Sequence, residues 1–133
     1  MIEINNLTTS LVDEEFLKRV AQEVLGREKQ GNRDLSIALV GQGRMRELNK
    51  KYRGKNRVTD VLSFPGNGLG EIVIYLREVK KNAKRFGSTF EKELARVLIH
   101  GILHLLGYNH EKNTIEAKKM KEKEEYYLSQ IYG

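Results

Sequence analysis

The sequence contains no cysteine, no tryptophan, a single proline and no long uncharged apolar run. Without cysteine the chain has no disulfide partner and no thiolate ligand, so a bound metal must rely on His, Asp, Glu or water. No stretch resembles the roughly 20 apolar residues that a membrane-spanning helix needs. The first residues also lack the basic-then-apolar layout of a secretory signal, which predicts a cytoplasmic protein.

Positive charge is in surplus, with 24 Lys and Arg against 18 Asp and Glu and a formal net charge of +6. This balance suits a polyanionic partner, of which nucleic acid is the leading candidate. The alternative is charge that only maintains solubility, because total charge does not locate a patch. With 39% hydrophobic residues, a length of 133 residues predicts a single folded domain over residues 1–133.

Apolar periodicity and turn residues divide the chain into strands and helices. Strands are expected, in order, at 1–6 (an edge strand), 35–40, 60–64 and 71–75, with a turn at 65–68. Helices are expected at 13–25, about 45–53, about 79–86, 88–106 and about 117–131. The sequence therefore predicts an α+β fold with about five helices and an approximately four-stranded mixed sheet.

Three local features specify these helices further. Gly26 is expected to end the first helix. Phe86 is expected on the apolar stripe of the third, which Gly87 closes. The Ser-x-x-Glu sequence from Ser88 to Glu91 has the form of a capping box. It opens a helix that is apolar on nearly every side, which is typical of a helix buried in the middle of a domain.

All three histidines lie between positions 100 and 110. His100 and His104 are four residues apart, so a helix places them on one face. Gly107 can adopt a left-handed conformation and return the chain, which brings His110 to the same ion. Three imidazoles suit one Zn²⁺ and leave a fourth tetrahedral position for water. The alternative, three hydrogen-bonded buried histidines, is less favourable because each ring on an apolar helix needs its own polar partner.

The histidine spacing matches the His-x-x-x-His-x-x-Gly-x-x-His pattern of metzincin proteases and predicts a zincin-like central helix. Those proteases place a Glu base directly after the first His, where this chain has Gly101. A peptide hydrolase is therefore the less favoured alternative. Structural zinc sites are normally closed by four protein ligands, usually including cysteine, so an open catalytic site is favoured here. Glu111 could still close the site as a fourth ligand.

The segment His-Gly-Ile-Leu-His-Leu-Leu-Gly-Tyr-Asn-His at 100–110 resembles the signature of the YbeY family, the bacterial endoribonucleases also called rRNA maturation factors. Residues 48–65 and 69–74 resemble two further blocks of that family, so the likeness extends over essentially the whole domain. The chain departs from the family at Val58, where Pro is common, and at Asn109, where Asp is usual. The second departure removes a carboxylate beside the expected metal.

The resemblance implies a single-strand-directed, metal-dependent endoribonuclease active in 16S rRNA 3′-end maturation and ribosome quality control. It implies single-stranded RNA, rRNA and the ribosome as partners, zinc at the three histidines, and an activity-linked arginine at Arg53. A guanidinium suits this role because it is always charged and pairs with phosphate oxygens in a bidentate fork. The residues allow two routes to cleavage, by a metal-activated water or by the RNA 2′-hydroxyl.

Around Arg53, the side chains of Lys51, Lys55 and Arg57 are expected to bind substrate RNA. For the lysines, cations that favour a helix C-terminus are an equal alternative. Tyr52 is expected to pack in the core. If zinc were structural, the chain would be a ribosome-binding protein that cuts nothing.

Two other charged segments follow. A second basic cluster comprises Lys80, Lys81, Lys84 and Arg85, whereas the lysines of 118–123 alternate with glutamates and are expected to form a solvated face. Glu124 lies at the edge of an apolar stripe, where it either reaches solvent, as its position favours, or orients a ligand imidazole.

Overall fold

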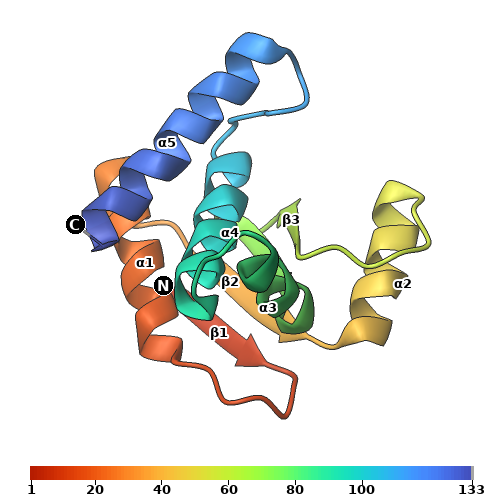
Figure 1. Ribbon diagram of the computed structural model, residues 1–133. Coiled ribbons are helices and arrows are strands. Elements are labelled where there is room, and N and C mark those ends of the chain that lie inside the picture. Colours follow the sequence, from red (N-terminus) through yellow and green to blue (C-terminus); the bar gives the residue numbers. More distant parts are fainter. Residues whose placement is uncertain (133) are drawn as a thin grey trace.

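A four-stranded sheet forms the centre of the computed structural model, which describes residues 1–132 (Figure 1). The strands are β1 (Ile2–Asn6), β2 (Leu35–Val40), β3 (Val61–Pro65) and β4 (Gly70–Tyr75). Their order is β1-β2-β4-β3, in which β1, β2 and β4 are parallel and β3 is antiparallel to β4. The mixed four-stranded sheet is confirmed, and β1 is an edge strand as predicted.

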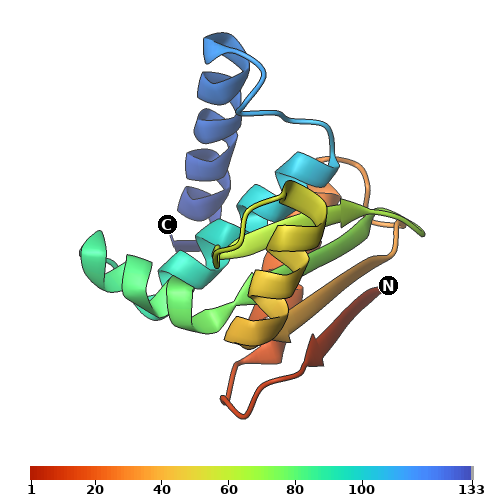
Figure 2. The same ribbon diagram turned by 90° about the vertical axis from the view of Figure 1, so that its right-hand side faces the viewer.

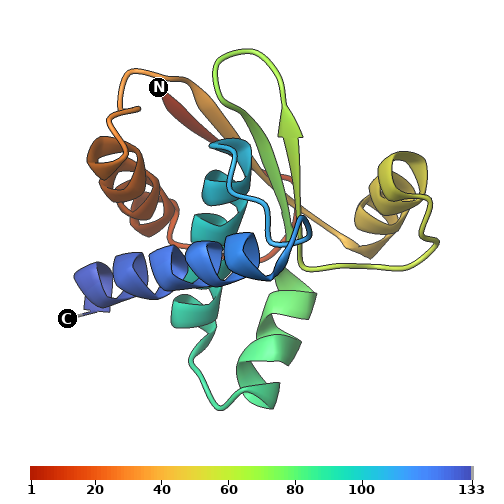
Figure 3. The ribbon, with the colours of Figure 1, turned by 90° about the horizontal axis from the view of Figure 1, so that it is seen from above.

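The five helices cover the two faces of the sheet unequally. They are α1 (Glu14–Arg27), α2 (Gln42–Arg53), α3 (Leu76–Arg85), α4 (Phe90–Leu105) and α5 (Thr114–Tyr132). Figures 2 and 3 show α2 alone on one face, with α1, α4 and α5 on the other. Strand alternation explains both layers, because Ile37 and Leu39 of β2 pack in the larger core while Ala38 and Val40 pack against α2.

Helix α4 lies at the centre of the larger layer and contacts β3, β4, α1, α3 and α5. Gly101 allows this helix to approach the sheet closely. A Cβ at this position would lie 3.0 Å from Ile72 and 3.1 Å from the Ser63 hydroxyl. The side of α4 that follows His100 is therefore filled by the sheet, and a glutamate in place of Gly101 has no room there.

Most predicted helix ends differ from the observed ones by one to three residues, and two of these differences have a clear local cause. Helix α1 continues through Gly26 to Arg27, and the left-handed residue beyond it is Lys29, with φ of 61°. At the start of α4 the N-cap is Thr89, whose hydroxyl accepts a hydrogen bond from the Lys92 amide at 3.1 Å. The Ser88 hydroxyl is buried without a hydrogen-bond partner, so the predicted capping box does not form.

Two apolar residues also differ from expectation. Pro65 was expected to begin a turn, but it is the last residue of β3 and pairs with Gly70. Because β3 is an edge strand, the missing N–H of proline is tolerated there. Phe86 was predicted on the buried stripe of α3, yet its side chain is 66% exposed. The Phe86 amide still donates to the Asn82 carbonyl at 2.9 Å, but Phe86 follows the last helical residue, so its ring lies beyond the buried turns of Val79 and Ala83. Within residues 1–132, no helix is long and apolar enough to cross a membrane.

Candidate metal centre

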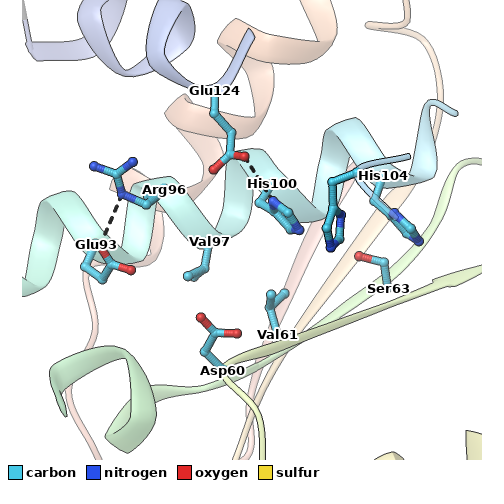
Figure 4. A pocket seen from close by; sticks show the side chains of 10 residues that line it. Asp60, Val61, Ser63, Glu93, Arg96, Val97, His100, His104 and Glu124 are labelled. Carbon is cyan, nitrogen blue, oxygen red and sulfur yellow. Dashed lines mark hydrogen bonds and ion pairs between the residues drawn. The ribbon is translucent and has the colours of Figure 1, made fainter. Parts of the chain in front are cut away.

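Helix α4 presents His100 and His104 to a cavity of about 260 Å³ (Figure 4). The two residues are one helical turn apart and therefore project from the same side. The start of β3 forms the opposite wall through Val61 and Ser63. The Ser63 hydroxyl donates to the Gly101 carbonyl at 3.2 Å, which fixes the distance between this wall and the helix.

The loop after α4 brings the third histidine to the same cavity. Gly107 has φ of 104°, and its amide donates to the His104 carbonyl at 3.1 Å. The next amide, of Tyr108, reaches back to the Leu103 carbonyl at 3.1 Å, so the helix ends in a Schellman motif. The returning chain places the His110 ring centre 5.0 Å from that of His100 and 6.3 Å from that of His104.

The chemistry of this donor set fits one divalent ion. With metal–nitrogen bonds of about 2.0–2.1 Å, two imidazoles on a tetrahedral ion have ring centres about 5 Å apart. His100 and His110 meet this separation, whereas His104 and His110 are wider apart. As placed, no three His, Asp or Glu side chains within residues 1–132 form a complete coordinating set. His104 and His110 are both exposed, so changes of side-chain torsion can close the remaining gap.

Glu124 of α5 orients the first histidine. Its carboxylate lies 3.0 Å from His100 Nδ1, and the Glu124 side chain is only 14% exposed. A carboxylate only accepts hydrogen bonds, so Nδ1 carries the proton and Nε2 keeps its lone pair for a ligand. The expectation that Glu124 reaches solvent is wrong, because α5 packs against α4 and directs this residue inwards.

The pKa values of two histidines shift in opposite directions. Burial alone lowers the pKa of His100, but the hydrogen bond and charge of Glu124, with a smaller effect of Asp60, outweigh it and raise that pKa. Burial also lowers the pKa of His104, and the charges of the two neighbouring histidines lower it further. His104 therefore favours the neutral, ligand-competent form at neutral pH.

Arg53 reaches the histidine loop from the other layer of the molecule. Its Nη2 atom donates to Glu111 Oε1 at 3.2 Å, and the same oxygen lies 3.7 Å from His110 Nε2. The Asn109 side chain accepts a hydrogen bond from the Glu111 amide at 2.9 Å, which orders this turn without the carboxylate usual at that position. The structure thus links Arg53 to the loop that carries His110, although Arg53 lies 47 positions before His100 in the sequence.

The other residues expected to bind RNA do not line the cavity. Lys51, Lys55 and Arg57 are exposed, and within residues 1–132 none of them bonds to a histidine. Gly54, with φ of 67°, ends α2 and starts the loop that carries Lys55 and Arg57. Tyr52 is 57% exposed and packs edge to face on Phe64, so its predicted core position is wrong.

The far end of the cavity holds charged residues that sequence patterns did not indicate. Glu93 is 4% exposed and pairs with Arg96 at 3.2 Å, while Asp60 approaches from the start of β3 (Figure 4). Burial raises the pKa of Glu93, although Arg96 offsets part of this effect. Glu93 lies seven residues before His100, two helical turns away on the same side of α4, and this spacing was the only available signal.

The fold and site define a class of protein: an α+β sheet protein whose cavity is lined by three histidines, with an arginine paired to a glutamate of the histidine loop. The chain belongs to the Endoribonuclease YbeY family, which it matches over residues 3–132. It is 51% identical to an endoribonuclease YbeY of Thermodesulfovibrio yellowstonii over 105 residues, 73% of this chain and 66% of that protein. It is 42% identical to that of Thermotoga maritima over 122 residues, 90% of this chain and 81% of that protein.

A solved structure has the same fold. The solution structure of TM1509 from Thermotoga maritima superimposes with a TM-score of 0.71 at 37% sequence identity. The match covers 100% of this chain and 90% of that one.

Proposed function

We propose that this protein is a zinc-dependent endoribonuclease that cleaves single-stranded RNA, with its metal at His100, His104 and His110 and Arg53 as a catalytic residue. Family membership supports the reaction class, since the relatives matched above bear the name endoribonuclease. The resemblance of the long motifs supports a role in 16S rRNA 3′-end maturation and ribosome quality control in the cytoplasm. The net charge of +6 suits an RNA substrate.

The observation that supports the proposal most is the ion pair of Arg53 with Glu111, whose carboxylate also lies 3.7 Å from His110 Nε2. RNA cleavage places negative charge on a phosphate, and catalysis gains most from positive charge fixed close to it. A divalent cation at the histidines supplies a Lewis acid there. Arg53 adds a guanidinium, whose two parallel N–H groups match two phosphate oxygens.

The remaining residues prepare this arrangement. Glu124 holds the His100 ring with Nε2 directed away from the carboxylate. Glu111 pairs with Arg53 before RNA binds, so an incoming phosphate takes the place of one carboxylate oxygen on the guanidinium. Because the Arg53 and Glu111 side chains are 40% and 60% exposed, this exchange costs little.

Metal analysis of the purified protein tests the site. We expect about one Zn²⁺ per chain and its loss in His104→Ala, because two imidazoles hold zinc much less tightly than three. The metal content should be unchanged in Lys119→Ala, an exposed residue of α5 that does not line the cavity. Unaltered protein without stoichiometric metal, or full retention by His104→Ala, would show that the site is wrongly assigned.

Cleavage of single-stranded RNA tests Arg53. We expect Arg53→Gln to lower the cleavage rate by about 10²–10³-fold, as for removal of one transition-state donor. Arg46→Gln is the matched control, since Arg46 is an exposed cation on the same helix that does not pair with Glu111 of the histidine loop as Arg53 does. Equal rates for the two variants would exclude a catalytic Arg53. Cleavage of peptides in place of RNA would favour the protease-like alternative, and metal binding without any cleavage the structural one.

A further inference from the structure

Helix α3 carries more positive charge than its fold requires. Its ten residues include five cations and one carboxylate, a net charge of +4. All five are exposed, and within residues 1–132 none forms an ion pair: Arg77, Lys80, Lys81, Lys84 and Arg85. Helix α5 shows the contrasting pattern, with four lysines and four glutamates and no net charge. The charge of α3 is therefore left for a partner outside the chain.

An exposed aromatic ring lies at the end of this charged helix. Phe86 directly follows α3, its side chain is 66% exposed, and the Arg85 guanidinium lies 5.8 Å from the ring centre. Exposing a phenyl ring to water gives no folding advantage. An exposed ring beside unpaired cations has the composition of surfaces that bind single-stranded nucleic acid, where bases stack on aromatics and cations follow the phosphates.

The Phe86 end of α3 lies next to the histidine cavity. Asn82 is four residues before Phe86, close to the same side of the helix, and its Nδ2 atom is 3.5 Å from Asp60 Oδ2. Asp60 lines the cavity, and in Figure 4 it lies beside the pale green ribbon of α3. From His100 the cavity extends along α4 to Glu93, about 10 Å at the helical rise. An RNA strand that leaves the histidines along this cavity therefore meets the Asn82 side of α3 and Phe86 next. It reaches Lys80, Lys81 and Lys84 around the helix, where they line a separate hollow with Gln42 and Tyr75.

We propose that Phe86 and the cations of α3 form a second binding surface for the same single-stranded RNA, beyond the nucleotides at the histidines. This proposal rests on the function proposed above. The cations neutralise phosphates, and one unpaired base stacks on the Phe86 ring. A duplex keeps its bases stacked on each other and offers none to this ring, so the surface selects single strands.

Replacing the ring alone tests the stacking contact without changing charge. The variants are Phe86→Ala and, as a control, Leu11→Ala, which is fully exposed and lies away from any basic helix. Binding is measured with 2′-O-methyl RNA single strands of about 12 and about 3 nucleotides. We expect Phe86→Ala to weaken binding of the longer strand by about fivefold or more and to leave the shorter one unchanged. Leu11→Ala should change neither.

Replacing the lysines tests the phosphate contacts. Lys80, Lys81 and Lys84 are changed together to glutamine, and the control changes Lys118, Lys119 and Lys121 of α5, which are equally exposed. Both variants lose three charges. The plot of log affinity against log salt concentration has a negative slope, to which each phosphate contact on a single strand contributes about −0.7. For the longer strand, we expect only the α3 variant to make this slope less steep, by about 2.

Three outcomes overturn the proposal. In the first, the α3 and α5 variants lose affinity equally, which would show that binding depends on total charge alone. In the second, Phe86→Ala binds the longer strand as tightly as the unaltered protein. In the third, Phe86→Ala weakens the binding of both strands equally. If the unaltered protein cleaves RNA and the α3 variants bind normally, only this surface is excluded. If the unaltered protein neither binds nor cleaves single-stranded RNA, the proposed function fails as well.

Discussion

Glu124 contacts the proposed metal site through a single hydrogen bond to His100. Its carboxylate fixes the proton on His100 Nδ1 and so the orientation of Nε2. We expect Glu124→Gln to lower zinc affinity by about 10–100-fold, as for other partners of metal-bound imidazoles. Competition with a chromophoric chelator measures this affinity. Glu122→Gln is the control, because Glu122 is exposed on the same helix. Equal affinities in both variants would contradict an orienting role.

Glu28 joins the histidine loop to two helices. Its carboxylate, 14% exposed, accepts hydrogen bonds from the Tyr108 hydroxyl at 3.0 Å, from the Tyr127 hydroxyl, and from Lys123 at 3.4 Å. Burial alone raises the pKa of Glu28, but the two hydroxyls and Lys123 outweigh it, so the net shift is downward. Tyr108 is two residues from His110, which makes Glu28 the anchor of that loop.

The downward shift of the Glu28 pKa predicts how stability changes with pH. A lowered folded-state pKa stabilises the protein above the ordinary value of 4.5, and this contribution is lost as the pH falls below it. We expect Glu28→Gln to lower the free energy of unfolding by about 1–3 kcal/mol at pH 7. Urea denaturation should show this difference shrinking below pH 4.5. The control Glu23→Gln removes a half-exposed pair with Arg27 and should cost less than about 1 kcal/mol. A constant difference at all pH values would exclude the pKa effect.

At the scale of elements, the C-terminal end of α1 has a lysine where a glycine is usual and a glycine inside the helix. The Lys29 amide donates to the Gly26 carbonyl and the Gln30 amide to the Leu25 carbonyl, which is a Schellman motif. The left-handed position of this motif, usually glycine, is held by Lys29, while Gly26 lies within the helix. Both residues therefore cost free energy where they are.

Exchanging these residue types should stabilise the protein. We expect Gly26→Ala to add up to about 1 kcal/mol, because nothing lies within 4 Å of the new Cβ, and Lys29→Gly to add about 1 kcal/mol by removing strain. Thermal unfolding of the single and double variants measures both. Gly101→Ala is the control. It has the same helical gain, but its Cβ meets Ile72 and Ser63, so it should not stabilise. Equal stabilisation by Gly26→Ala and Gly101→Ala would contradict the close packing of α4 on the sheet.

The sequence predicted the elements well because their signals are local. Short apolar runs next to turn residues predicted β2 and β4, whereas the strand order depends on long-range pairing that no local pattern contains. The errors are confined to ends, where one hydrogen bond decides the outcome. Thr89, not Ser88, caps α4, and the helix before Phe86 stops one residue too early to bury that ring. Both outcomes depend on the direction in which the next segment leaves.

For the whole molecule, site residues that lie close together in the sequence could be predicted, whereas contacts between distant segments could not. The histidines lie within one helix and its following turn, so spacing alone was sufficient to group them. Arg53 entered only through the family resemblance, because its contact with Glu111 joins residues 58 positions apart. The contact between His100 and Glu124 needs α5 to fold back along α4. No periodicity encodes such a contact, so the sequence could not decide whether Glu124 faces the site or solvent.

The distribution of the core predicts how the molecule responds to metal removal. The apolar side of α4 is filled by the sheet, α1 and α5, whereas His104 and His110 lie exposed at the cavity mouth. The core is therefore complete without an ion. A structural zinc site has the opposite property, because there the binding free energy is the folding free energy.

We accordingly expect chelation to abolish RNA cleavage reversibly while far-UV circular dichroism and cooperative thermal unfolding persist. Added Zn²⁺ should raise the midpoint of unfolding as its concentration rises, by about 2.7 kcal/mol of stability at 100 times the dissociation constant. His104→Ala, which removes a ligand but no core contact, should unfold like the chelated protein and respond little to zinc. A metal held only at the rim of α4 cannot support a core that it does not touch, so cooperative unfolding should survive its removal. Loss of cooperative unfolding on chelation would therefore contradict this arrangement and assign the ion to the fold.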